Sequence, residues 1–189
     1  YEGSEQFFVN LSNATNATIA DAQGIGTIKD DGTGGGGTND DRPAFSINDV
    51  TVNEGAGTIT FTVTRTGDTT LASTVDYATA GDTATSGSDF TAKSGTLNFA
   101  AGVGTMTVTL PITVVNDTTY EGSERFFVNL SNATNATIAD AQGIGTISDD
   151  DAMPVASVSV STPSVAEDGT TNLVYTVTID RPSSVDTVI

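Results

Sequence analysis

The sequence contains no histidine, cysteine or tryptophan, and it has only 6 basic residues against 24 acidic ones. The missing histidine excludes the usual general base, the commonest zinc ligand and a Ser-His-Asp triad, and the missing cysteine excludes disulfides and thiolate metal sites. A formal net charge of −18 repels nucleic acid and anionic membrane surfaces. No apolar run approaches the roughly 18 residues of a membrane span. We therefore expect no enzyme, no nucleic-acid partner and no membrane span in this segment.

A long internal repeat is present instead. Residues 1–31 and 120–150 differ at only two positions, where Gln6 corresponds to Arg125 and Lys29 to Ser148. The two copies lie 119 residues apart, a period that is typical of whole domains in tandem rather than of solenoid units of roughly 20 to 50 residues. Further on, "VAEDGTTNLVYTVT" from Val165 resembles "VNEGAGTITFTVT" from Val52.

The repeat predicts four segments. Residues 1–31 are expected to be the C-terminal half of one repeat, 32–43 a glycine-rich linker, 44–151 one complete domain, and 152–189 the N-terminal part of a diverged repeat. The glycine-rich segment predicts a flexible tether, whereas only "AMP" follows Asp151 and predicts a stiff junction.

Alternation of apolar and polar residues is the main pattern within 44–151, as in "GTITFTVTRT" and "GTMTVTLPITVV". It predicts seven strands, near residues 44–52, 57–66, 72–79, 95–99, 104–115, 124–131 and 137–148. Seven short strands without any helical period indicate an all-β chain of tandem immunoglobulin-like antiparallel β-sandwiches. The predicted core includes Phe45, Phe61, Phe99, Phe126 and Leu130.

The acids are distributed unevenly over this fold. If successive strands run up and down, nine of the thirteen acids between residues 45 and 151 fall in the loops and the tail at one end of the sandwich. These nine are Glu54, Asp82, Asp89, Asp117, Glu121, Glu124, Asp149, Asp150 and Asp151. So many carboxylates would repel one another by about 1 kcal/mol per close pair even in high dielectric.

The repulsion predicts a bound cation. Lys93 and Arg125 are the only bases expected nearby, and a donor set made of oxygen atoms suits calcium better than magnesium, which prefers fewer protein ligands. The alternative is that the acids only form a well-solvated surface suited to a salty medium.

The residues from "FSINDVTVNEGAG" through "GSDF" and "VNDTTYEGSERFFVNL" to "GTISDDD" resemble the Calx-beta domain family, named from the sodium-calcium exchanger. The resemblance implies calcium as the bound ion. It also implies a ligand set of Glu54, Asp89, Asn116, Asp117, Glu121, Glu124, Asp149, Asp150 and Asp151, with the Thr119 carbonyl as a further ligand. Asn116 departs from the acid usual in the family, which weakens one ion site. In the partial repeats the corresponding residues are Glu2, Glu5, Asp30, Asp31 and Glu167.

The resemblance leaves two functions open. The first is a calcium-rigidified extension module, or stalk, in a large repetitive adhesin-like protein of an extracellular or cell-surface location, expected to be bacterial, with neighbouring repeats as partners. The second is a structural stretch of an extracellular filament built from the repeats, with other copies of the chain as partners. A calcium sensor coupled to a transporter fits near-identical tandem copies less well.

Two other interpretations are less favoured. Seven Asn-X-Ser/Thr triplets, at Asn10, Asn13, Asn16, Asn116, Asn129, Asn132 and Asn135, match glycosylation acceptors, but such triplets arise easily in a threonine-rich repeat. Paired acids such as Glu121 and Glu124 could serve a glycosidase, but they fall in the expected ion-binding loop, where no aromatic residues are expected to line a substrate site.

Overall fold

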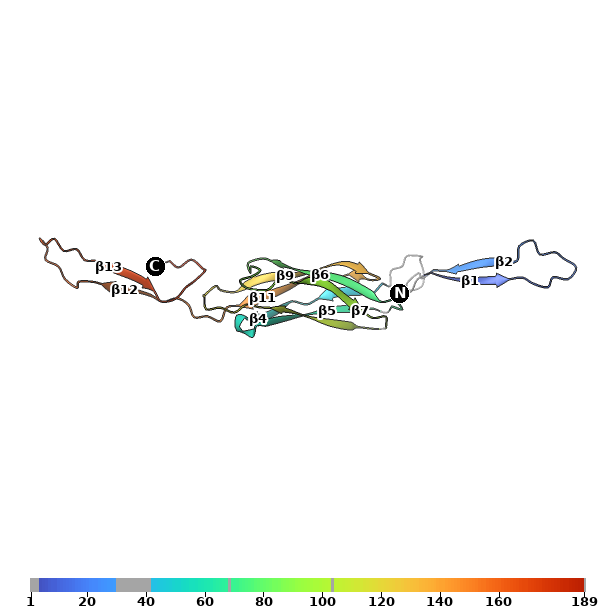
Figure 1. Cartoon of the computed structure of the whole chain (residues 1–189), viewed down its shortest axis with the longest axis horizontal. Helices are drawn as coiled ribbons and strands as arrows, with labels where there is room; N and C mark the ends of the chain where they lie inside the picture. Colours follow the sequence, from blue (N-terminus) through green and yellow to red (C-terminus); the bar gives the residue numbers. More distant parts are fainter. Residues whose placement is uncertain (1–3, 30–41, 68, 103, 189) are drawn as a thin grey trace.

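A computed structural model of the chain describes residues 4–29, 42–67, 69–102 and 104–188. Its central part is a sandwich of two sheets (Figure 1). One sheet has the order β10-β3-β5-β8, and its strands are β3 (Ala44–Ile47), β5 (Thr58–Thr66), β8 (Met106–Thr113) and β10 (Thr137–Ile138). The other has the order β4-β11-β9-β6-β7, with β4 (Val50–Asn53), β6 (Ser73–Gly81), β7 (Ser94–Phe99), β9 (Glu124–Thr134) and β11 (Gln142–Ser148). The all-β sandwich expected from the alternation is confirmed.

The first and last predicted strands each divide between the two sheets, so the expectation of two continuous strands was wrong. Between β3 and β4, Asn48 Oδ1 accepts the Thr62 N–H at 2.6 Å and Asp49 Oδ1 accepts the Ile144 N–H at 2.7 Å. These side chains satisfy backbone donors where the strand changes sheets. The resulting pairs β3–β10 and β4–β11 are parallel, whereas the other paired strands of the sandwich are antiparallel. A short 3₁₀ helix, η1 (Glu54–Ala56), follows β4.

Aromatic rings fill the core between the sheets. Phe126 stacks on Phe90 with ring centroids 4.4 Å apart and meets Phe61 edge-on at 5.9 Å. Gly145 of β11 lies over this group, and a Cβ there would come within 2.6 Å of the Phe126 ring. The glycine therefore allows β11 to approach the core closely.

A buried arginine near the C-terminal end of β5 bonds to neighbouring segments of the chain. Arg65 is fully buried and donates to Ser73 Oγ at 3.1 Å and to the carbonyl oxygen of Ala100 at 2.9 Å. Because both acceptors lie outside β5, the guanidinium ties three segments of the chain together.

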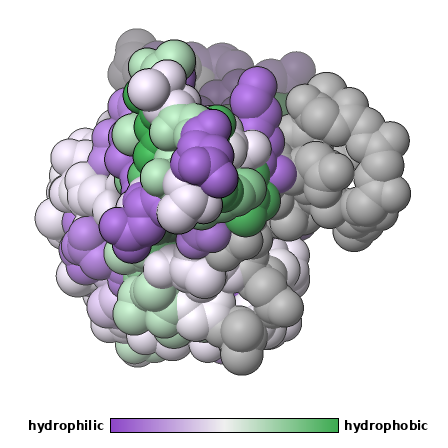
Figure 2. Space-filling view, turned by 90° about the vertical axis from the view of Figure 1, so that its right-hand side faces the viewer, coloured by the Kyte–Doolittle hydropathy of each residue, from purple (hydrophilic) through white to green (hydrophobic). Residues whose placement is uncertain are grey.

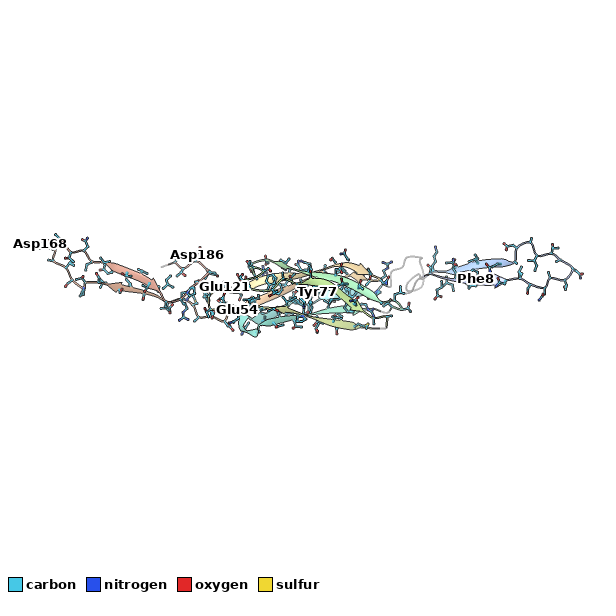
Figure 3. The ribbon with its side chains drawn as sticks, in the orientation of Figure 1. Phe8, Glu54, Tyr77, Glu121, Asp168 and Asp186 are labelled. Atoms are coloured by element: carbon cyan, nitrogen blue, oxygen red, sulfur yellow. The ribbon has the colours of Figure 1, made fainter. Side chains whose placement is uncertain are left out.

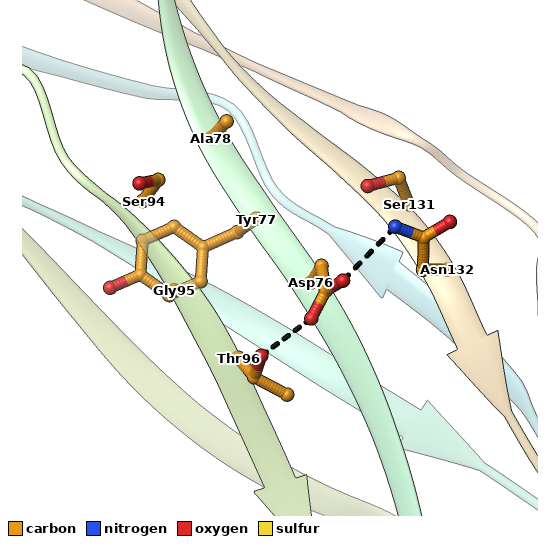
Figure 4. A pocket seen from close by; sticks show the side chains of 8 residues that line it. All are labelled: Asp76, Tyr77, Ala78, Ser94, Gly95, Thr96, Ser131 and Asn132. Carbon is orange, nitrogen blue, oxygen red and sulfur yellow. Dashed lines mark hydrogen bonds between the residues drawn. The ribbon is translucent and has the colours of Figure 1, made fainter.

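The outer face of the larger sheet carries a shallow groove of about 330 Å³ over β6, β7 and β9 (Figure 4). Asp76 at its centre accepts hydrogen bonds from Thr96 Oγ1 at 2.5 Å and Asn132 Nδ2 at 3.0 Å. These bonds, first the one from Thr96, lower the pKa of the Asp76 carboxyl. Since Asn132 has a φ of 50°, the Asp76 bond also holds a left-handed residue at the end of β9. Asn13, Asn16 and Asn135 share that conformation, which gives four of the seven asparagine triplets a structural role.

Two hairpins flank the sandwich in the sequence. β1 (Glu5–Asn10) and β2 (Gln23–Ile28) pair in the register of β9 and β11, with Glu5 opposite Ile28 as Glu124 lies opposite Ile147. Hydrophobic side chains lie on the surface of this hairpin, which Figure 2 shows end-on. Phe7 is 51% exposed, whereas its counterpart Phe126 is fully buried. The second hairpin consists of β12 (Ala156–Val160) and β13 (Tyr175–Ile179).

Among the residues that the structure describes, no helix is long and apolar enough to cross a membrane.

Candidate metal centre

Acidic residues from four separate segments meet at one end of the sandwich, the end that faces the β12–β13 hairpin (Figure 3). We call this end the acidic pole; it comprises Glu54 on η1, Asp89 in the β6–β7 loop, Asn116, Asp117, Glu121 and Glu124 in and after the β8–β9 loop, and Asp149, Asp150 and Asp151 after β11. Within the described residues, two groups of three carboxylates each offer oxygen atoms within 4.8 Å of one another. They are Glu54 with Asp149 and Asp151, and Asp89 with Glu121 and Glu124.

Glu54 forms the inner wall of the first group. Its side chain is only 5% exposed, and Oε1 accepts the Asp117 N–H at 2.6 Å. Burial raises the pKa of the Glu54 carboxyl, the Asp117 hydrogen bond opposes this effect, and the charges of Asp117, Asp151 and Asp149 add to the increase. The charged form of Glu54 is therefore less favourable here than in water, and a positive charge beside it would favour that form.

Asp149 organises the neighbouring loop as well as the first group. Its Oδ2 accepts the N–H groups of Glu121 at 2.8 Å and Gly122 at 2.9 Å, and its Oδ1 accepts the Asp151 N–H at 2.8 Å. Burial works against the charge, but these three backbone donors outweigh it and lower the pKa of the Asp149 carboxyl. Glu121 belongs to the second group. Asp149, a member of the first group, therefore fixes the backbone of a residue of the second.

Asp151 has a shielded oxygen that the protein leaves without a partner. Its Oδ2 is buried and accepts no hydrogen bond from the described part of the chain. Burial, followed by the charges of Asp149 and Asp150, raises the pKa of this carboxyl. A shielded, unpartnered carboxylate oxygen in a group of acids is the arrangement expected of a cation ligand.

Asn116 and Asp150 point toward the same place beside Gly55. A Cβ at Gly55 would lie 2.8 Å from Asp150 Oδ2 and 3.4 Å from Asn116 Oδ1. The glycine after Glu54 therefore leaves room for both side-chain oxygens. Sequence reasoning did not identify Gly55, although a glycine directly after a candidate ligand is the signal that could have revealed it.

The second group contains the most strongly shifted carboxyl of the acidic pole. Burial raises the pKa of Glu124 to about 7, and the adjacent Asp89, through its charge and a side-chain hydrogen bond, adds to the increase. Burial first, then the charge of Asp89, likewise raises the pKa of Glu121. Asp89 is itself held in place because its Oδ2 accepts the Thr85 N–H at 2.5 Å. Without a cation, then, Glu124 loses its proton only as the pH rises through about 7.

The expected basic neighbours do not neutralise either group. Arg125 pairs with Asp82 at 3.2 Å, and Lys93 Nζ donates to the Pro111 carbonyl oxygen at 2.8 Å. Arg125 is therefore paired with Asp82, one of the nine acids expected at this end, and not with either group.

The remaining predicted ligands fall outside the two groups. Thr119 lies in the β8–β9 loop, where its N–H donates to Asp117 Oδ1 at 2.6 Å. Glu5 is exposed on β1, and Glu167 is exposed beside Asp168, at the tip of the β12–β13 hairpin (Figure 3). Glu2, Asp30 and Asp31 lie outside the described residues.

The donors of the acidic pole suit a hard cation. Both groups offer carboxylate oxygens only, with the Asn116 amide oxygen nearby, and calcium binds 6 to 8 such oxygens in a flexible shell. Fixed, partly buried carboxylates with raised pKa values, together with the unpartnered Asp151 oxygen, match a site that gains stability when a positive charge enters.

Residues 38–153 match the model of the Calx-beta domain family, and this match spans more than half of the chain. The chain belongs to the Calx-beta family. Its sandwich is similar to solved Calx structures: the apo form of the Calx CBD1 domain matches with 29% sequence identity and a TM-score of 0.52, over 57% of this chain and 99% of that one.

Two longer solved Calx chains match an equal share of this Calx-beta chain. The calcium binding domain CBD12 of CALX1.1 is 30% identical with a TM-score of 0.52, and CBD12 from CALX1.2 is 29% identical with a TM-score of 0.53. Each match covers 57% of this chain and 46% of the CBD12 chain, so the chain corresponds to about half of either structure. No curated protein gave a significant match.

The raised pKa of Glu124 predicts how the cation-free Calx-beta domain responds to pH. Because the pKa of Glu124 is higher in the folded state, its contribution to stability is complete below about pH 4.5 and disappears as the pH rises through about 7. In EDTA, the urea concentration at the midpoint of unfolding should therefore decrease as the pH is raised from 5 to 8. Glu124→Gln, which stays neutral, should flatten this decrease; an equal decrease in the variant and the wild type would contradict the assignment.

Proposed function

We propose that the Calx-beta domain of this chain binds Ca²⁺ at its acidic pole, one ion at each group of three carboxylates. The observation that carries the proposal is the convergence of Glu54, Asp149 and Asp151 on one point, where the buried Asp151 Oδ2 accepts no hydrogen bond from any described residue. Membership of a family whose solved relatives include a structure described as a calcium binding domain supports the choice of ion.

The geometry favours calcium over magnesium. Each group supplies three carboxylates from different segments, whereas magnesium usually keeps several of its waters and takes one or two protein carboxylates in a rigid octahedron. Glu121 and Glu124 lie on a loop and at the start of a strand, so small movements of the loop can adjust the distances to a larger ion. When bound, the ions would add positive charge at the two groups, which Lys93 and Arg125 do not neutralise.

Isothermal titration with CaCl₂ tests this function. We expect the wild-type chain to bind about two ions per molecule, with MgCl₂ binding at least tenfold more weakly. Glu54→Gln should remove the ion of the first group and Glu124→Gln that of the second. Asp140→Asn, which removes one acid of the β10–β11 loop, serves as the control. A wild-type chain that gives no calcium heat, with unchanged nuclear magnetic resonance shifts at the acidic pole, would exclude the proposal.

At the level of the whole chain, we propose a non-catalytic extension module built from successive repeats, in an extracellular or cell-surface protein. Two observations support it: residues 1–31 and 120–150 are nearly identical, and the β1–β2 hairpin has the register of β9 and β11. The exposed Phe7, Val9 and Leu11 correspond to core residues of the complete domain, as expected for one layer of another sandwich. Neighbouring repeats are then the partners, and calcium at the acidic pole would stiffen the junction after Asp151.

A structural filament is the second candidate. The observation that favours it is that both hairpins carry exposed apolar residues, among them Phe7 on β1 and Tyr175 on β13, which other copies could cover. Electron micrographs of the native material distinguish the two functions, because an extension module gives isolated strings whereas a filament gives ordered bundles.

A further inference from the structure

A short segment after β13, residues 180–184, lies against the β8–β9 loop of the complete domain. Tyr120 and Ser183 form a parallel β-bridge. The Tyr120 N–H donates to the Pro182 carbonyl oxygen at 3.4 Å, and the Ser184 N–H donates to the Tyr120 carbonyl oxygen at 3.0 Å. Both backbone groups of Tyr120 are thus bonded to the unit that follows the domain in the chain.

Side chains of the same segment reach the acidic pole. Ser184 lies close to the Glu121 carboxylate and lowers its pKa against the larger effect of burial, and the positive charge of Arg181 acts on Asp151. Arg181 is also paired with Asp180 at 3.1 Å, while Asp180 Oδ1 accepts the Val155 N–H at 2.7 Å, which fixes the base of the β12–β13 unit. The segment is therefore anchored on its own unit and extended toward the domain.

The β8–β9 loop is consequently held from two sides. Asp149 binds the N–H groups of Glu121 and Gly122 from the domain itself, and residues 182–184 bind Tyr120 from the following unit. Gly122 has a φ of 82°, so the chain turns sharply immediately after Glu121. In such a turn, the position of the Glu121 carboxylate depends on backbone contacts on both sides.

We propose that residues 180–184 form a docking strap through which the following unit holds Glu121 in its cation-binding position. The strap holds the backbone next to Glu121 through Tyr120 and places Ser184 beside the Glu121 carboxylate. Cation binding at the second group and docking of the β12–β13 unit then strengthen each other.

This coupling rests on the proposed calcium function, and it has a reciprocal consequence. If docking raises the affinity for calcium by some factor, calcium raises the docking equilibrium by the same factor. The bridge itself, in contrast, needs no ion, because its bonds join backbone groups of Tyr120, Pro182 and Ser184. Docking can therefore be measured both with and without calcium.

The test uses the full 189-residue chain. Ser184→Pro removes both the N–H and the hydroxyl and is expected to weaken calcium binding at the second group about 3- to 10-fold. Ser184→Ala removes only the hydroxyl and should have a smaller effect. Ser164→Ala, in the exposed loop between β12 and β13, is the control. In parallel, hydrogen exchange of the Ser184 amide in the wild type should slow by a similar factor when CaCl₂ replaces EDTA.

The outcomes separate the strap from the calcium site. Suppose that the wild type and Ser184→Pro bind calcium equally well, and that calcium does not change the hydrogen-exchange rate of the wild-type Ser184 amide. The strap proposal is then wrong, while the calcium function stands. If the wild type binds no calcium, the proposed function fails first and the coupling fails with it. Weaker calcium binding in Ser184→Pro together with slower exchange in the wild type would support the strap.

Discussion

Calcium is expected to raise the melting temperature of the complete domain by roughly 10 °C or more. A ligand present at 100 times its dissociation constant stabilises the folded state by about 2.7 kcal/mol, and in a domain of this size each kcal/mol shifts the midpoint by several degrees. The structural reason is that the ion replaces repulsion among the acids of the two groups with attraction. Differential scanning calorimetry of the full chain, with CaCl₂, MgCl₂ or EDTA, provides the measurement.

A double variant should raise the melting temperature of the calcium-free domain and reduce the increase that calcium produces. Glu121→Gln combined with Glu124→Gln removes two carboxylates whose pKa values burial and Asp89 raise. Without calcium at about pH 8, above the pKa of Glu124, the variant should melt a few degrees higher than the wild type, because about 1 kcal/mol of repulsion per close pair disappears. With calcium it should lose the part of the increase that the second group provides.

The matched control removes the same charge away from both groups. Asp140→Asn with Asp168→Asn changes the net charge equally, at the β10–β11 loop and at the tip of the β12–β13 hairpin. This control should keep the full calcium-dependent increase. If both double variants behave alike, the acids act only through the overall charge, and the solvated-surface interpretation becomes the better one.

The location of the acidic pole follows from the sequence because an up-and-down sandwich fixes which loops share an end. Glu54, Asp89 and Glu121 are far apart in the chain, but alternate loops bring them together. The partition into two groups could not be predicted, since it depends on where β11 ends and how its tail turns. Asp149 shows this limit: its spacing indicates a ligand, but the bonds to Glu121 and Gly122 exist only in the folded loop.

The division of the first and last strands has a similar cause. Phe45 and Ile47 alternate with polar residues, and Val50 and Val52 resume the alternation one position out of phase, a shift that the prediction of one strand did not take into account. The side-chain bonds of Asn48 and Asp49 to backbone groups of two different strands allow the change of sheet, and the alternation carries no information about such bonds. The contact of residues 182–184 with Tyr120 was unpredictable for the same reason, because "RPSS" resembles any turn.

Phe126→Ala is expected to destabilise the cation-free domain by about 3 to 5 kcal/mol. The ring is fully buried and contacts both Phe90 and Phe61, so its removal leaves a cavity that two large rings cannot easily fill. Urea unfolding in EDTA measures the loss. Phe127→Ala, on the outer face of the same strand, is the control and should cost less, because Phe127 is only half-buried.

The same substitution should also weaken calcium binding at the second group, because the aromatic stack positions two of its ligands. Phe90 directly follows Asp89, and Phe126 lies two residues after Glu124 on β9. The stacked rings, 4.4 Å apart, therefore fix the distance between the loop that carries Asp89 and the strand that carries Glu124. Phe126→Leu, which keeps most of the apolar volume, allows titration where the alanine variant unfolds. Wild-type calcium affinity in a folded Phe126→Leu chain would show that the loops hold the ligands without help from the core.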